Sequence, residues 1–203
     1  MNHRSLVVIT AGLSQPSSTR LLADQLFAAA VAAATRHDVA FDVTVIELRD
    51  LAHHIADHLL TGFPRGELRE ALAAVAAADA VIAVTPVFTA SYSGLFKSFF
   101  DVVDRDALTD KPVLIAATAG TARHSLVLEH ALRPMFAYLR AAVVPTAVFA
   151  ASDDWGAGSG ENTLRARITR AAGELAREVS RREPVAVADP FALTASFEDL
   201  LKG

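Results

Sequence analysis

Short apolar runs recur along the chain, separated by amphipathic segments. Most of the runs are continuous, which is the pattern of a strand covered on both faces. The segment 41–48, FDVTVIEL, instead alternates apolar and polar residues, as a strand at a sheet edge does. The runs predict five strands, at Ser5–Ala11, Phe41–Leu48, Asp79–Val84, Pro112–Thr118 and Val143–Ala150.

The segments between these strands have helical periodicity. Only 49–64 has a weak pattern, which predicts loop with some helix, and Pro134 is expected to kink or divide its helix. Strands that alternate with helices predict an α/β fold with a parallel sheet covered on both faces. Five strands in a chain of this length fit a flavodoxin-like doubly wound sheet, order 2-1-3-4-5. The predicted helices are Thr19–Arg36, Glu67–Ala77, Gly94–Val103, Ser125–Arg140 and Asn162–Arg182.

The length of 203 residues predicts one domain with a single core. We place this domain at residues 1–183. The tail 184–203 contains Pro184 and Pro190 before a short helical candidate, ASFEDLLK. We expect the tail to pack on the domain or on a partner subunit.

Composition excludes several classes of protein. The chain has no cysteine, so it has no disulfide, no zinc–thiolate site and no cysteine nucleophile. A net charge of −4 without a basic stripe argues against nucleic-acid binding and favours a small-molecule ligand. No run reaches the roughly 18 to 20 apolar residues of a membrane helix. The first apolar run leads into a glycine and hydroxyls rather than a cleavage site, so the expected location is cytoplasmic.

A cluster of hydroxyls follows the first strand, in AGLSQPSSTRLL. Ser14, Ser17, Ser18 and Thr19 precede a helix, whose first backbone N–H groups are unpaired and carry partial positive charge. This combination favours a phosphate site, and the absence of a Walker lysine and of G-x-G-x-x-G favours a single terminal phosphate, as in FMN. Arg20 could add a charge-assisted contact. An ordinary N-cap is the alternative.

The segment TPVFTASYSGLFKSFFD follows the third strand. Pro86 lacks an N–H and is expected to end that strand. The next four residues would then present backbone amides and small side chains to a flavin ring at the carboxyl edge of the sheet. A plain strand-to-helix connection with Ser93 as N-cap is the alternative. The residues assigned to the ring are Pro86, Val87, Phe88, Thr89 and Ala90.

A third loop of the same kind, ATAGTARHS, follows the fourth strand. Ala119, Gly120 and Thr121 would place amides against the other edge of the ring. Arg123 and His124 could meet a reductant or a neighbouring subunit, although a surface role for His124 is the simpler interpretation.

Other candidates carry weaker signals. His54 and His58 are four residues apart, but no distant third ligand suggests a metal site. The segment 153–155, Asp-Asp-Trp, follows the fifth strand and could reach a ligand or a neighbour. Three phenylalanines, Phe96, Phe99 and Phe100, are too crowded for one helix face, which suggests a core or a partner contact. No strand is followed by the G-x-S-x-G elbow of a serine hydrolase.

The second loop resembles the T-P-x-[YF]-x-x-S-Y-S-G signature of NADPH-dependent FMN reductases, and TAG…LEHALRPMF resembles that family's third loop and helix. The resemblance runs from about Ser5 to Ala150, and the nearest branch is the one partnered with luciferase-like monooxygenases. Many family members have an arginine within the phosphate loop, where this chain has Gln15-Pro16; Arg20 is the candidate replacement.

The resemblance implies an oxidoreductase that transfers hydride from NADPH or NADH to N5 of FMN, in a flavodoxin-like FMN-binding reductase domain at 1–183. It implies a homodimer or homotetramer that supplies reduced flavin to a flavin-dependent monooxygenase. The cofactor carries the chemistry, so no catalytic residue and no metal ligand is assigned. Two alternatives stay open: an FMN-dependent quinone or azo reductase, and a non-enzymatic flavodoxin-like electron carrier.

Overall fold

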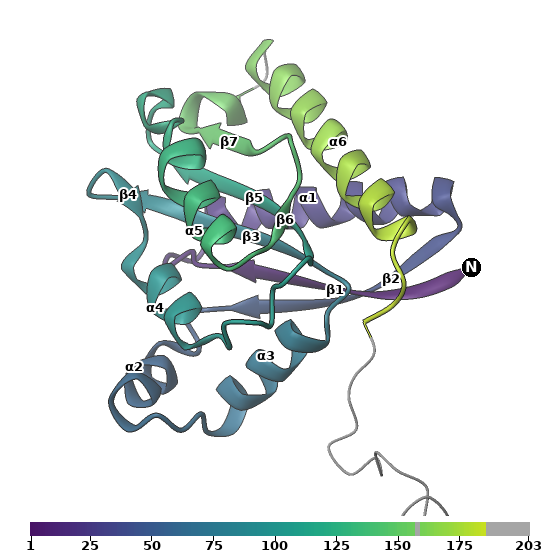
Figure 1. Cartoon of the computed structure of the whole chain (residues 1–203). Helices are drawn as coiled ribbons and strands as arrows, with labels where there is room; N and C mark the ends of the chain where they lie inside the picture. Colours follow the sequence, from purple (N-terminus) through teal and green to yellow (C-terminus); the bar gives the residue numbers. More distant parts are fainter. Residues whose placement is uncertain (157–158, 186–203) are drawn as a thin grey trace, which may run out of the picture.

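A computed structural model describes residues 1–156 and 159–185 of the chain (Figure 1). A parallel sheet in the order β2-β1-β3-β5-β6 forms the middle layer, and β7 continues alongside β5 beyond β6. This arrangement confirms the predicted doubly wound α/β sheet, with the alternating strand β2 at its edge. The parallel strands are β1 (Asn2–Thr10), β2 (Val39–Glu47), β3 (Ala80–Phe88), β5 (Pro112–Ala119), β6 (Ala142–Val143) and β7 (Val148–Ala151).

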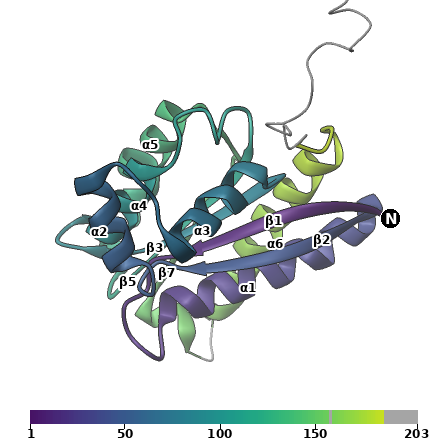
Figure 2. The same ribbon diagram turned by 90° about the horizontal axis from the view of Figure 1, so that it is seen from below.

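Helices cover both faces of the sheet, and each face has its own apolar core. Figure 2 shows α1 along one face of the strands and α3, α4 and α5 on the other. α6 packs beside α1, on the same core. The α-helices are α1 (Ser18–Ala34), α2 (Ala52–Thr61), α3 (Gly66–Ala77), α4 (Gly94–Val102), α5 (Arg133–Tyr138) and α6 (Ser159–Ser180); short 3-10 turns are η1 (Thr35–His37), η2 (Ala122–His124) and η4 (Ser152–Trp155).

The crowded phenylalanines of α4 belong to the core of this chain. Phe96 and Phe99 are fully buried and Phe100 nearly so. Phe100 lies edge-on to Phe136 of α5, with ring centroids 4.9 Å apart. Aromatic pairs in this geometry contribute beyond the area they bury, so α4 and α5 are joined by ring contacts rather than left for a partner.

Pro86 does not end its strand, contrary to the sequence-based expectation. β3 runs on to Phe88 and turns back as β4 (Ser91–Tyr92), which pairs with it antiparallel. The pairing of β3 with β1 stops at Val84, and the carbonyl of Pro86 accepts the Ser93 amide on that same side. The N–H that Pro86 lacks would point to the side where β1 has already ended, so the strand loses no bond to β1.

Two other elements differ from their predictions. The run predicted as one strand at 143–150 is divided into β6 and β7, with Pro145 between them. The helix predicted at 125–140 opens with a π-helical turn, η3 (Leu128–Leu132), and Pro134 lies in the first turn of α5, so the proline does divide the helix. Residues 49–64 contain a ten-residue helix, α2. Most of the tail, with its ASFEDLLK segment, lies outside the described residues.

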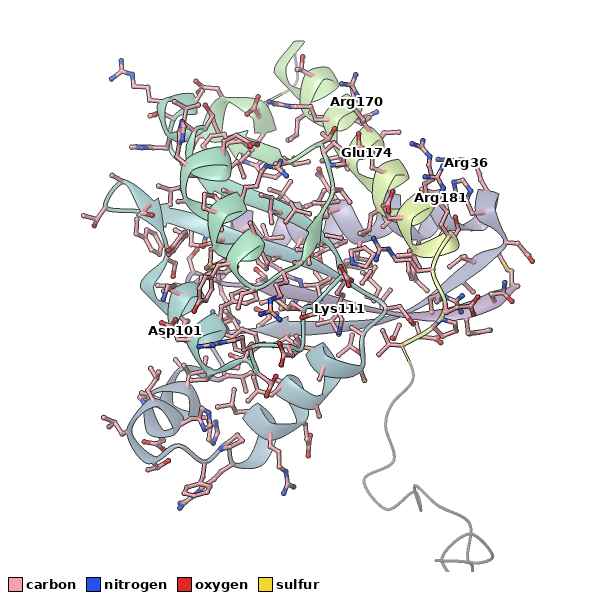
Figure 3. The ribbon with its side chains drawn as sticks, viewed as in Figure 1. Arg36, Asp101, Lys111, Arg170, Glu174 and Arg181 are labelled. Carbon is pink, nitrogen blue, oxygen red and sulfur yellow. The ribbon has the colours of Figure 1, made fainter. Side chains whose placement is uncertain are left out.

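A buried lysine ties α3 to the start of β5. Lys111 is only 5% exposed, and its Nζ donates to the carbonyls of Val75 (2.6 Å) and Ala76 (2.8 Å) at the end of α3. Figure 3 labels Lys111 near the last turn of that helix. The lysine therefore satisfies carbonyls that a helix C-terminus leaves unpaired.

Among the described residues, no helix combines the length and the apolar character needed to span a bilayer.

Candidate functional site

The loop between β1 and α1 is compact at Gly12. A Cβ placed on Gly12 would lie 2.0 Å from Ser17 Oγ and 3.2 Å from Thr19 Cβ, so the loop passes too close to the helix start for any side chain. Ser17 is the N-cap of α1, and its Oγ accepts the Arg20 amide at 3.3 Å. Ser14 and Ser18 are exposed beside it. The loop thus presents free hydroxyls next to a helix N-terminus.

Thr19 has a different position from the other hydroxyls. It is 2% exposed, and its Oγ1 lies 2.8 Å from Oγ1 of Thr118 at the end of β5. This pair satisfies two buried hydroxyls and joins the start of α1 to the middle of the sheet. Thr19 therefore holds the loop in place, and the exposed serines are better placed to meet a ligand.

Arg20 is ion-paired within the chain. Its Nε donates to Asp24 at 2.8 Å, and its Nη1 donates to Glu47 at the end of β2. The hydrogen bond to Asp24, with Glu47 adding to it, raises the pKa of the Arg20 guanidinium. Contact with a phosphate would require Arg20 to share its donors with these carboxylates, so its assignment stays a prediction.

The residues after β3 form the tip of a tight hairpin. Thr89 and Ala90 connect β3 to β4 with positive φ angles of 48° and 69°. Positive φ at both central residues fits the right-handed twist of a two-residue hairpin but strains residues other than glycine, asparagine and aspartate. The hairpin projects Phe88, which is 46% exposed, from the carboxyl edge of the sheet.

The third loop is open. Ala119 ends β5, a Cβ on Gly120 would meet nothing within 4 Å, and Thr121 caps η2 by accepting the Arg123 amide at 3.3 Å. Residues 120–124 are exposed. Their backbone amides are accessible to a ligand at this edge.

A hollow of about 260 Å³ brings the three loops together. Of the predicted site residues, Ser18, the stretch 86–88 and Ala119–Gly120 line it. The residues that do not line it are Ser14, Ser17, Thr19, Arg20, Thr89, Ala90 and Thr121. The volume is below the usual 300 to 1,000 Å³ of a ligand pocket. The hollow would therefore hold part of an FMN molecule and leave one side of a flavin ring accessible. All of its side chains are uncharged, which suits a neutral ring with polar edges.

Two lining residues, Thr118 and Ser152, were not assigned from the sequence, and Trp155 falls in the segment 153–155 that was named only as a weaker candidate. Ser152 and Trp155 belong to η4, directly after β7, at the same carboxyl edge as the other loops. Their position after a strand was the available signal. A fixed turn supports them, because Asp154 accepts the Ala151 amide at 2.8 Å.

No group of three or more histidines, cysteines, aspartates or glutamates suited to a metal ion occurs within residues 1–156 and 159–185. His54 and His58 lie on α2, on the opposite face of the sheet from α1. Neither histidine lines the hollow.

Comparison with known proteins points to one kind of enzyme. Residues 5–156 match the family described as NADPH-dependent FMN reductase. The FMN reductase (NADPH) of Pseudomonas aeruginosa is 38% identical over 150 residues, covering 74% of this chain and 78% of the relative. The NADH-dependent FMN reductase SfnE of Pseudomonas putida is 39% identical over 150 residues, covering 72% and 76%. A solved oxidoreductase from Corynebacterium diphtheriae is 49% identical with a TM-score of 0.87, covering 90% of this chain and all of that one.

Proposed function

The chain belongs to the NADPH-dependent FMN reductase family and is an NAD(P)H-dependent FMN reductase, and we propose that it reduces FMN in the hollow at the carboxyl edge of its sheet. The observation that carries this location is the convergence of the turns after β1, β3, β5 and β7 on one uncharged hollow. Ligands of doubly wound sheets bind at this edge, where the strand order reverses. β1 and β3 are the neighbours that flank that switch point.

The start of α1 would hold the FMN phosphate. Ser18 and Ser14 supply exposed hydroxyls, Ser17 fixes the first turn, and the Thr19–Thr118 bond anchors that turn to β5. The partial positive charge of a 17-residue helix favours an anion at this end. Binding would therefore use preformed backbone donors and need no lysine.

The hairpin and the third loop would hold the flavin ring. Pro86 to Phe88 form one wall of the hollow, and Thr118 to Gly120 form the neighbouring wall. When bound, FMN supplies a ring that accepts hydride from a reduced nicotinamide. The residues of the chain position the two rings and exclude charge from the ring environment, and no side chain has to transfer a proton.

The proposal also covers the location, the oligomeric state and the partner of the enzyme. We propose a cytoplasmic homodimer or homotetramer that delivers reduced flavin to a flavin-dependent monooxygenase. An exposed apolar patch at the end of α2 and just after it supports self-association, because Leu60 and Phe63 are 87% and 70% exposed. The similarity to SfnE, a NADH-dependent FMN reductase, supports a role in supplying reduced FMN.

The activity is tested by mixing the purified protein with FMN and NADH or NADPH and following the nicotinamide absorbance. We expect FMN-dependent oxidation faster than in protein-free controls, and no enhancement over those controls would contradict the function. A quinone or azo dye added without free FMN distinguishes the main alternative, since sustained turnover would then require tightly bound flavin.

A further inference from the structure

A second, larger hollow lies beside the flavin hollow, in the groove between α1 and α6. Its volume is about 440 Å³, within the usual range of small-molecule sites. Trp155 lines both hollows, and Ser18 of the first hollow is one helical turn from Leu21 of the second. The two spaces are therefore neighbours that share one wall.

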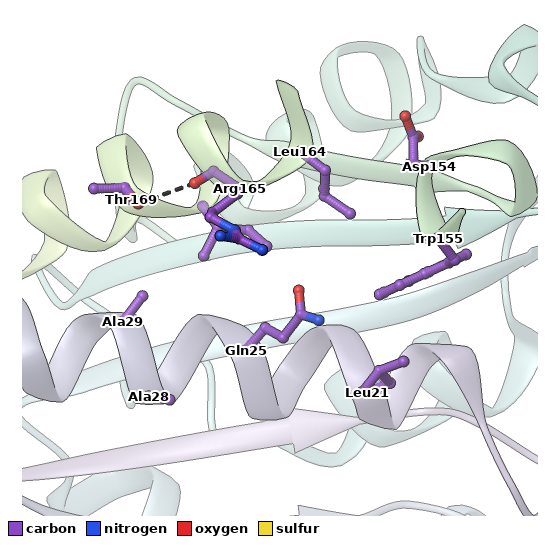
Figure 4. A pocket seen from close by; sticks show the side chains of 10 residues that line it. Leu21, Gln25, Ala28, Ala29, Asp154, Trp155, Leu164, Arg165 and Thr169 are labelled. Atoms are coloured by element: carbon purple, nitrogen blue, oxygen red, sulfur yellow. Dashed lines mark hydrogen bonds between the residues drawn. The ribbon is translucent and has the colours of Figure 1, made fainter. Parts of the chain in front are cut away.

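The groove combines flat apolar walls with a few polar groups. Figure 4 shows Gln25 reaching from α1 into the groove, Leu164 and Arg165 projecting from α6, and the Trp155 ring closing one end. Ala28 and Ala29 leave room along α1 because they have only a methyl group. The space is thus suited to a planar ring with hydrogen-bonding edges.

The residues around the groove match adenine among planar rings. A primary amide such as that of Gln25 can pair with an adenine edge through a donor and an acceptor at once. Indole offers a face on which a base can stack. Arg165 places a cation at the same groove, where the phosphates of a nucleotide would need one.

We propose that the groove between α1 and α6 binds the adenine half of NAD(P)H while its nicotinamide lies at the flavin hollow. This inference rests on the proposed function and adds the location of the second half of the reductant. Gln25 is seven residues from Ser18, about 10 Å along α1 at the rise of an α-helix. The pyrophosphate linker of a dinucleotide can cover that separation, passing Trp155.

The test compares two hydride donors, NADH and reduced nicotinamide mononucleotide, which lacks the adenine half. Gln25→Leu removes the amide, and Ala29→Leu fills the groove with a side chain that keeps helix propensity high. We expect each variant to raise the KM for NADH about tenfold at similar kcat, the size expected for a lost bidentate contact. The KM for the mononucleotide should stay within twofold of wild type. Arg170→Ala is the matched control, because Arg170 is exposed on α6 (Figure 3) and does not line the groove.

Several results would overturn the assignment. These are an unchanged KM for NADH in both variants, an equal rise for both donors, and a change confined to the KM for FMN. Thermal unfolding of each variant checks that the fold is kept, and using two variants keeps the test decisive if one fails to fold. If the wild type reduced FMN with neither donor, that result would instead contradict the proposed function.

Adenosine monophosphate provides an independent readout. If the groove holds the adenine of the coenzyme, this nucleotide should inhibit competitively against NADH, and Gln25→Leu should weaken that inhibition. Inhibition that does not compete with NADH would show that the groove serves a separate nucleotide, and it would contradict the proposal.

Discussion

At the scale of single residues, the start of α1 depends on the narrow space between Gly12 and Ser17. Ser17 Oγ lies where a Gly12 side chain would have to go, and the same Oγ caps the helix. The sequence places a glycine after the first strand and offers a cap among the serines. The close approach between them could not be predicted, because it depends on the exact path of the loop.

Gly12→Ala should weaken FMN binding by tenfold or more, because its Cβ would displace the N-cap and the first turn of α1. Ser17→Gly removes both Ser17 atoms near that Cβ, and glycine at an N-cap costs only a few tenths of a kcal/mol. The double variant should therefore recover much of the affinity in an FMN titration. A double variant no better than Gly12→Ala would show that the clash is not the cause.

Ser18→Asp should also weaken FMN binding by about tenfold or more, because it places a negative charge beside the expected phosphate. A carboxylate in the first turn of a helix stabilises the fold by roughly 0.3 to 1 kcal/mol, so unfolding should not become easier. Equilibrium dialysis with FMN and thermal unfolding measure the two effects separately. The neutral variant Ser18→Asn is the control, and equal FMN affinity in both variants would locate the phosphate elsewhere.

At the scale of elements, the buried strands were predictable because a short continuous apolar run fits few structures other than a strand covered on both faces. The residues at which these strands end were harder to predict, because the effect of a proline depends on the strands beside it. Pro86 is accommodated because β1 has already ended, whereas Pro145 separates β6 from β7. α2 was only partly predicted, because Ile55 is the one residue of that helix that is fully buried.

The contact between α3 and β5 should make stability depend on pH. Burial lowers the pKa of Lys111 from 10.5 to about 8, although nearby Asp79 favours the charged form. Between these values the unfolded chain holds a proton that the folded chain has lost, so the free energy of unfolding rises with pH. Between pH 7.5 and 9.5, the free energy of unfolding of the wild type should rise by about 1 to 2 kcal/mol relative to that of Lys111→Met.

Urea unfolding at the two pH values measures this difference. Lys97→Met provides the matched lysine substitution, because Lys97 is partly exposed on α4 beside Asp101. A constant difference between wild type and Lys111→Met across this range would contradict the expected effect of burial.

At the scale of the whole molecule, the meeting of the three loops at one edge could be predicted from topology alone. Parallel strands end at one edge, so the loops after β1, β3 and β5 had to meet there. Trp155 was only a weaker candidate, because a position after a strand does not show which way the side chain faces. The groove between α1 and α6 involves side chains more than 130 positions apart, which no local pattern reveals.

Self-association should depend on the exposed apolar patch at the end of α2 and just after it. Leu60→Glu combined with Phe63→Ser should shift the protein toward the monomer mass in sedimentation experiments, because apolar contacts would be replaced by charge and a hydroxyl. Val31→Glu, on the partly exposed face of α1, is the control. An unchanged mass would mean that any oligomer uses another surface.

The wall between the two hollows is also the chain's single tryptophan. Its intrinsic fluorescence therefore comes from one known place, without a label or an engineered probe. Flavin arriving on one side should quench this emission, and a nucleotide arriving on the other should shift its wavelength. One optical signal could thus time the order in which the two molecules bind.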